Sequence, residues 1–228
     1  MLAVVFQVRS DAGPGDSGKP ALNVLSWQRA LQPERGKWSL PGGRIDADED
    51  LTDSVRRQLA EKVDLREVAH LEQLAVFSDP HRVPGDRVIA STFLGLVPSP
   101  ATPALPSDTR WHPVNDLPPM AFDHGPMVAD ARARLVAKLS YTNIGFALAP
   151  REFALSTLRD IYSAALGYPV DATNLQRVLA RRGVITPTGT TTNPGRSGGR
   201  PAKLYRFTES LLRVTDEFAA LRPPSAPR

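Results

Sequence analysis

Two segments of the chain concentrate side chains that bind charged ligands. Residues 42–65, GGRIDADEDLTDSVRRQLAEKVDL, combine a glycine turn with carboxylates and arginines. Residues 172–208 contain seven arginines and lysines and no acidic residue. The first composition suits phosphate or metal chemistry, and the second is typical of a surface that binds a polyanion. The chain has no cysteine, so a metal would need oxygen or histidine ligands.

The first segment resembles the Nudix box, a loop-helix-loop signature with a fixed register of glycine, glutamate, arginine and apolar positions. The positions that fit are Gly43, Glu49, Arg57, Leu59, Glu61 and Leu65. The preceding residues 36–43, GKWSLPGG, also match the usual lead-in. The resemblance implies a Nudix-like fold for the first part of the chain.

The departures from that signature predict the loss of catalysis. In active family members, three glutamates at i, i+3 and i+4 hold a divalent metal beside a diphosphate, and the corresponding residues here are Gln58, Glu61 and Lys62. Magnesium needs anionic oxygen ligands, and the Lys62 ammonium would lie where the metal's charge should be. We therefore expect neither a metal site nor a catalytic residue. Asp64 replaces the usual glycine, and aspartate tolerates a left-handed helix cap.

A Nudix pocket without its metal can still bind a nucleoside diphosphate derivative. Arginine forks match diphosphate oxygens, and aromatic faces stack on adenine. The candidate effector-binding residues are Trp38, Arg44, Glu49, Glu61, Arg82, Arg87, Phe122 and His124.

The elements that must position this pocket can be read from periodicity. Residues 3–8 and 22–27 are short β-rich runs around a Gly/Pro turn, and residues 88–97 are another strand candidate. Leu51, Val55, Leu59 and Val63 predict an amphipathic helix over residues 50–63 that is capped by Asp50. A second long helix is expected from Asp123, with apolar positions at Val128, Ala131, Leu135 and Leu139.

The basic segment lies in a second group of predicted elements. Ser156 can cap a helix that ends near Gly167, and Asp171 can cap a second helix with Leu175, Val178 and Leu179 on its buried face. A Gly/Thr/Pro loop and the strand-like residues 202–207 then predict a β-hairpin wing. Two helices joined by a tight turn suit reading of the DNA major groove. The candidate DNA-binding residues are Thr173, Asn174, Gln176, Arg177, Arg181, Arg196, Arg200 and Lys203.

Charge separates the two halves. Residues 1–147 hold 16 Lys/Arg against 18 Asp/Glu, whereas residues 148–228 hold 12 against 6. We expect an α+β protein with an effector-sensing domain at residues 1–140 and a DNA-binding domain at residues 148–228, joined by a linker at residues 140–150. The first domain would be a Nudix-like α/β/α sandwich with a mixed sheet, and the second a winged helix-turn-helix.

Taken together, the two halves resemble the NrtR family of Nudix-related transcriptional regulators of NAD metabolism. The resemblance rests on residues 36–45 (GKWSLPGGRI), 121–124 (AFDH), 150–153 (PREF) and 199–207 (GRPAKLYRF). It implies a homodimeric repressor on a palindromic operator of double-stranded DNA, near NAD biosynthesis or salvage genes. ADP-ribose or a related nucleotide would be the releasing effector, with no cofactor required.

Two alternatives remain at this point. One is an active Nudix hydrolase of the ADP-ribose pyrophosphatase type that also binds DNA, with Glu49 and Glu61 around a solvent-held metal. The other is a basic tail that binds RNA or a protein, although no stacking aromatic platform accompanies the arginines. The chain shows no signal peptide and no apolar run of the ~20 residues that span a membrane, so a cytoplasmic protein without membrane partners is expected.

Overall fold

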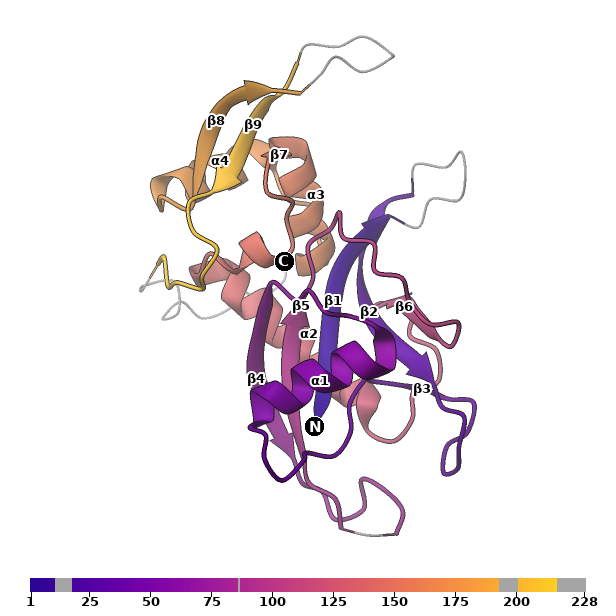
Figure 1. Ribbon diagram of the computed structural model, residues 1–228. Helices are drawn as coiled ribbons and strands as arrows, with labels where there is room; N and C mark the ends of the chain where they lie inside the picture. Colours follow the sequence, from indigo (N-terminus) through magenta and orange to yellow (C-terminus); the bar gives the residue numbers. More distant parts are fainter. Residues whose placement is uncertain (11–17, 86, 193–200, 217–228) are drawn as a thin grey trace, which may run out of the picture. The chain divides into compact units, whose positions relative to one another are not determined.

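The computed structural model describes residues 1–10, 18–85, 87–192 and 201–216 (Figure 1). The chain divides into two compact units, Met1–Arg134 and Leu135–Arg228. The division falls inside one continuous helix, α2 (His124–Tyr141).

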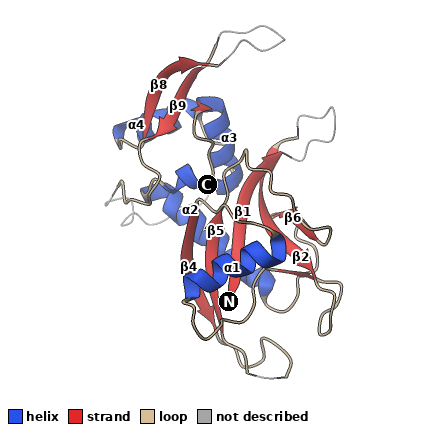
Figure 2. Cartoon of the chain, viewed as in Figure 1, coloured by secondary structure: helices blue, strands red, loops and turns tan. Residues whose placement is uncertain are grey.

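The first unit is built on one mixed sheet (Figure 2). Its strands are β1 (Leu2–Ser10), β2 (Pro20–Gln28), β3 (Trp38–Ser39), β4 (His70–Phe77), β5 (Ala90–Leu96) and β6 (Thr109–Pro113). The order is β3-β2-β1-β5-β4, and β6 also pairs with β2. β1 and β5 run parallel, whereas the other pairs are antiparallel, which confirms the predicted mixed sheet.

Helix α1 (Leu51–Val63) covers one face of this sheet (Figure 1). Side chains alternate between the faces of a strand, so Ala3 and Val5 of β1 share one face. They form a buried cluster with Val55, Leu59 and Val63 of α1. The predicted apolar stripe is therefore confirmed at these three helix positions. The prediction is wrong for Leu51, which is 39% exposed because the first residue of the helix precedes the covered turns.

The first turns of α2 lie on the opposite side of the sheet (Figure 1). Val128, Ala131, Leu135 and Leu139 are all buried, as their spacing predicted. The strand expected at residues 88–97 begins later, at Ala90, and Val88 and Ile89 are exposed.

The second unit is a small helical domain with a three-stranded sheet. It contains η1 (Ile144–Ala147), β7 (Phe153–Ala154), α3 (Leu155–Leu166), α4 (Ala172–Arg181), β8 (Ile185–Thr191) and β9 (Lys203–Phe207). The strand order is β7-β9-β8, all antiparallel. β8 and β9 form the predicted hairpin, and β8 extends through residues that the sequence assigned to the Gly/Thr/Pro loop.

Three local predictions for this unit are wrong. Helix α3 begins before Ser156, at Leu155, with Ala154 at its cap and no side-chain cap hydrogen bond. Val178 is only half-buried, because Leu175 and Leu179 point more directly at the core. Residues 140–150 are no open linker: Thr142, Asn143 and most of residues 144–149 are buried.

Asn143 explains why that segment is ordered. Its side-chain amide donates to the Leu211 carbonyl, and its side-chain oxygen accepts from the Arg213 amide, at 2.8 and 2.7 Å. One side chain thus ties the end of α2 to residues near the end of the described chain. No helix in the described ranges has both the length and the apolar character that a membrane crossing requires.

Candidate effector pocket and DNA-binding surface

Helix α1 is fixed at both ends by aspartates. The Asp50 carboxylate accepts from the amides of Thr52 and Asp53 at 2.7 and 2.9 Å, which confirms the predicted N-cap. Asp64 ends the helix with φ 47° and ψ 36°, so it takes the left-handed conformation expected of the glycine it replaces. Both caps set the position of the residues between them.

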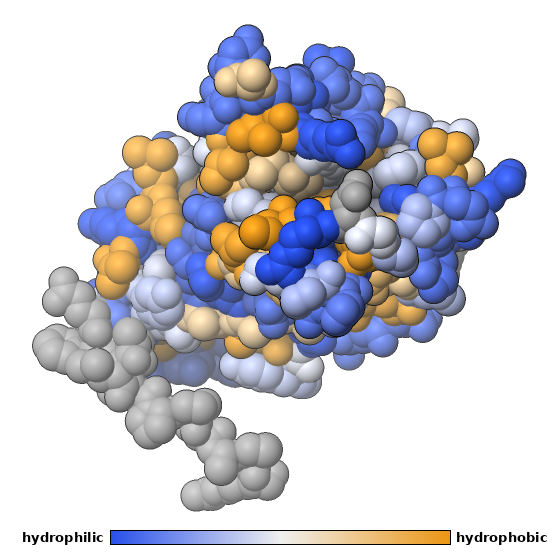
Figure 3. All heavy atoms as spheres, turned by 90° about the horizontal axis from the view of Figure 1, so that it is seen from below, coloured by the Kyte–Doolittle hydropathy of each residue, from blue (hydrophilic) through white to orange (hydrophobic). Residues whose placement is uncertain are grey.

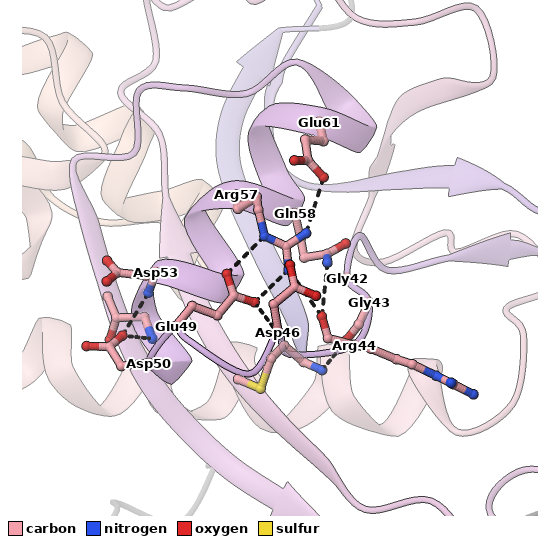
Figure 4. Close-up of polar contacts among 12 residues, drawn as sticks. Gly42, Gly43, Arg44, Asp46, Glu49, Asp50, Asp53, Arg57, Gln58 and Glu61 are labelled. Atoms are coloured by element: carbon pink, nitrogen blue, oxygen red, sulfur yellow. Dashed lines mark hydrogen bonds and ion pairs between the residues drawn. The ribbon is translucent and has the colours of Figure 1, made fainter.

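Arg57 gathers the carboxylates of this region (Figure 4). Its guanidinium donates to both oxygens of Glu49 at 2.9 and 2.6 Å, and lies 3.0 Å from Asp46 and 3.3 Å from Glu61. This bidentate pairing is the strong form of an arginine–carboxylate contact. The Arg57 hydrogen bonds hold the pKa of Glu49 at about 2. Glu49 and Glu61, the two carboxylates that the sequence allows around a metal, are thus both paired with Arg57.

Gln58 takes the place of a metal-binding carboxylate and is buried. Its amide nitrogen donates to the Arg44 carbonyl at 3.2 Å (Figure 4). A Cβ on Gly43 would lie 2.3 Å from the Gln58 side-chain oxygen, so a larger residue there would force the end of the Gln58 side chain to move. Gln58 therefore helps to fasten the glycine turn to α1.

The resemblance to the Nudix box implies a divalent metal, and these residues do not fit one. Within the described part of the chain, no three His, Cys, Asp or Glu side chains are grouped to hold an ion. The Lys62 ammonium instead donates to the Gly42 carbonyl at 2.5 Å. An amide, an ammonium and carboxylates paired with Arg57 are a poor donor set for a hard cation.

A cavity of about 460 Å³ opens beside the glycine turn. Its lining comes from the start of β1, β2 and the residues after it, β3, the glycine turn, α1, residues 82–83 and 88–90, and Phe122 with the start of α2. The polar and aromatic lining side chains are Trp27, Arg29, Ser39, Arg44, Lys62, Arg82, Phe122 and His124. Apolar residues near it are exposed, Leu31 at 76% and Ile89 at 62%. Figure 3 shows apolar and polar patches side by side on the face seen from below.

Charge is the main property of this cavity. Four cationic side chains contribute to it, and no aspartate or glutamate is among its described lining residues. The side chain of Arg44 extends away from the Arg57 cluster (Figure 4). Such a lining attracts an anion, and the guanidinium groups match phosphate oxygens in geometry.

His124 is buried at one wall of the cavity. Its Nδ1 accepts from the Leu40 amide at 3.0 Å and lies 3.2 Å from the Ser39 hydroxyl. Burial lowers its pKa to about 4. The ring is therefore neutral near pH 7, and because Nδ1 accepts, its proton lies on Nε2.

Phe122 and Arg82 are held by their neighbours. Phe122 has a positive φ of 51°, and its ring lies 5.8 Å from His124 and 4.9 Å from the Arg29 guanidinium. Arg82 is buried and donates to both oxygens of Asp123 at 2.9 and 2.7 Å. An aromatic face and an oriented cation thus meet at the start of α2.

The structure brings half of the predicted effector residues together. Arg44, Arg82, Phe122 and His124 line the cavity, whereas Trp38, Glu49, Glu61 and Arg87 are not among its described lining residues. The Trp38 ring packs edge-on against His112, and Arg87 is exposed. Trp38 still shapes the pocket through its backbone, which pairs with Pro119 and Ala121.

Sequence reasoning missed two lining cations. Arg29 follows β2 in a polar run, and no periodicity or motif distinguishes it from a surface arginine. For Lys62 the sequence indicates only the replacement of a metal ligand and not a position in the pocket. The fixed register of the Nudix box could have found it, since that register places the metal site against the ligand.

The second unit presents a basic surface on α4 and β9. Asp171 caps α4 by accepting from the Asn174 amide at 2.7 Å, as predicted. Thr173, Asn174, Arg177 and Arg181 are exposed on this helix, and Lys203 is exposed on β9. Arg177 donates to the Asn174 side chain at 2.8 Å, which preorders both. Arg196 and Arg200 lie outside the described residues.

Gln176 has a structural partner. Its amide nitrogen donates to the Tyr205 hydroxyl at 2.9 Å and joins α4 to β9. The side chain thus fixes α4 against β9.

Comparison with known proteins identifies both units. Residues 10–131 match the NUDIX domain family, and residues 145–207 match the NrtR DNA-binding winged helix domain. The chain is 30% identical over 193 residues to the ADPR responsive transcriptional repressor NtrR of Acinetobacter baylyi, covering 82% of this chain and 76% of the relative. It is also 31% identical over 110 residues to an ADP-ribose pyrophosphatase of Methanocaldococcus jannaschii, covering 47% and 64% of the two chains.

A solved structure extends the likeness over nearly the whole chain. Shewanella oneidensis NrtR, crystallised with a 27mer DNA, superposes with a TM-score of 0.74 at 28% identity. The match covers 97% of this chain and 95% of that one. The predicted α+β architecture, a Nudix-like sandwich followed by a winged helix-turn-helix, is confirmed. The chain belongs to the NrtR family, in which a Nudix domain is joined to a DNA-binding winged helix.

Proposed function

We propose that this protein is a transcriptional repressor that binds DNA through its winged helix and is released by ADP-ribose or a related NAD-derived nucleotide. The A. baylyi relative is named for repression and for its response to ADPR, and the S. oneidensis relative was crystallised with DNA. We assign effector sensing to residues 1–140 and DNA binding to residues 148–228.

The lining of the cavity is the observation that supports a nucleotide effector. It joins four cationic side chains and the Phe122 ring, without a carboxylate among its described lining residues. A diphosphate supplies negative oxygens for the cations, and adenine supplies a flat face for the ring. The neutral His124 ring retains an Nε2–H donor for a hydroxyl or a phosphate oxygen.

The DNA surface suits a groove-reading dimer. We infer a homodimer on a palindromic operator near NAD biosynthesis or salvage genes, with its two α4 helices about 34 Å apart, one turn of DNA. Thr173, Asn174, Arg177 and Arg181 would face the major groove, and Lys203 would contact backbone phosphates.

A titration tests release. Genomic fragments that the protein retains supply the operator, and a gel shift then follows its binding as ADP-ribose is added. We expect ADP-ribose to free the operator, whereas ribose 5-phosphate, which lacks the adenine and the diphosphate, should not. Operator binding that persists at millimolar ADP-ribose would remove the effector assignment.

The same proposal includes the absence of hydrolysis. The alternative, an active hydrolase, is favoured by the similarity to an ADP-ribose pyrophosphatase. Against it stand Gln58 and Lys62, which replace carboxylates at two of the three metal-binding positions. Incubation of the protein with Mg²⁺ and ADP-ribose should release no AMP above a protein-free control, and rapid AMP formation would support the hydrolase.

A further inference from the structure

Lys62 projects from α1 into the cavity, where its surroundings position the ammonium. It donates to the Gly42 carbonyl at 2.5 Å and lies 5.8 Å from the centre of the Trp27 ring. Burial lowers its pKa, with repulsion from Arg29 and Arg57 adding to the effect and Glu61 opposing it. An ammonium in this position is stabilised by the arrival of negative charge.

Two of the other three cationic side chains of the cavity already have partners, whereas Arg44 extends away from the Arg57 cluster (Figure 4). Arg82 donates two hydrogen bonds to Asp123, and the Arg29 guanidinium lies over the Phe122 ring. An ammonium has three donors, and the Gly42 carbonyl takes one from Lys62. Two donors therefore remain for a ligand at the wall where the glycine turn meets α1.

We propose that Lys62 replaces the metal ion of this pocket: its ammonium binds the phosphoryl oxygens of the effector directly, so that a nucleoside diphosphate binds without a divalent cation. This inference rests on the proposed effector. It explains why the loss of carboxylates at positions 58 and 62 leaves an anion-binding cavity, since the positive charge is now covalently part of α1.

Calorimetric titration of the full-length protein with ADP-ribose, in EDTA and in Mg²⁺, tests the inference. The dissociation constant of the wild type should be the same in both buffers. Lys62→Met should weaken binding about ten- to hundredfold in EDTA, the value of a hydrogen bond to a charged group. Lys62→Arg, which keeps the charge, should retain most of the affinity.

Lys37→Met is the matched control, because Lys37 pairs with Glu34 and does not line the cavity. Operator binding by each variant verifies that it is folded. ADP-ribose binding that requires Mg²⁺, or that survives Lys62→Met unchanged, overturns the role of Lys62 and leaves the proposed function intact. No binding of ADP-ribose in either buffer overturns both.

Discussion

The buried ring of His124 links the pocket to pH. Burial lowers its pKa to about 4, with repulsion from Arg82 and Arg29 adding to this and Asp123 opposing it. The unfolded chain, with a histidine pKa of 6.5, binds a proton at a higher pH than the folded protein. The stabilisation is therefore complete above pH 6.5 and is lost as the pH falls toward 4, by about 3 kcal/mol.

Urea unfolding at several pH values measures this loss. His124→Asn is the useful comparison, because its side-chain oxygen can accept from the Leu40 amide without titrating in this range. The difference in unfolding free energy between wild type and variant should shrink as the pH drops from 6.5 to 4. A difference that is constant over that window would contradict the buried, neutral ring.

Gln58 provides a second test at the residue scale. Gln58→Glu would replace the amide that donates to the Arg44 carbonyl by a carboxylate oxygen, which faces that carbonyl without a donor. We expect the free energy of unfolding to fall by about 1–3 kcal/mol at pH 7. Gln73→Glu is the matched control, since Gln73 is exposed on β4. Equal stabilities of the two variants in chemical denaturation would argue against the buried contact.

At the scale of elements, α4 is held in place at its start and against β9, and its exposed face is the one that we propose to read DNA. Asp171 fixes its start, and the Gln176–Tyr205 hydrogen bond fixes it to β9. Only its outward side chains are then free to contact a groove. A substitution on this helix should therefore change both the operator affinity and the salt dependence of that affinity.

Arg177→Ala should weaken operator binding and reduce the dependence of log K on log salt by about one unit, because one phosphate or base contact from a cation is lost. Fluorescence anisotropy at a series of salt concentrations measures both quantities. Arg132→Ala removes a half-buried arginine of α2 that pairs with Asn115 and should leave the slope unchanged. Identical slopes for the wild type and Arg177→Ala would move the DNA surface away from α4.

At the scale of the whole molecule, the proposed function requires a coupling free energy between effector binding and DNA binding. If ADP-ribose weakens operator binding by a given factor, bound operator must weaken ADP-ribose binding by the same factor, which is typically about 5–150. Titrating ADP-ribose into free protein and into the preformed DNA complex measures the second factor, and DNA titrations with and without ADP-ribose measure the first. Unequal factors would mean that ADP-ribose displaces DNA by some route other than a shift between two states of one protein.

The sequence by itself determined the elements whose signals are local. Helix α1 could be predicted from its cap Asp50 and the apolar spacing from Val55 to Val63, and α4 from its cap Asp171. Capping and helical spacing act within a few residues. The loss of the metal ligands was readable as well, since the Nudix box has a fixed register. Strands β4 and β6 gave no comparable local signal.

Tertiary structure decided which residues share the cavity. Arg29, Lys62 and His124 are far apart in sequence and meet because β2 pairs with β3 and the Leu40 amide reaches across to the start of α2. The same packing turned Trp38 toward His112 and left Arg87 exposed. Residue types identify candidates for a diphosphate pocket. Which candidates line the cavity is decided by sheet register and long-range hydrogen bonds, because no local sequence pattern encodes these.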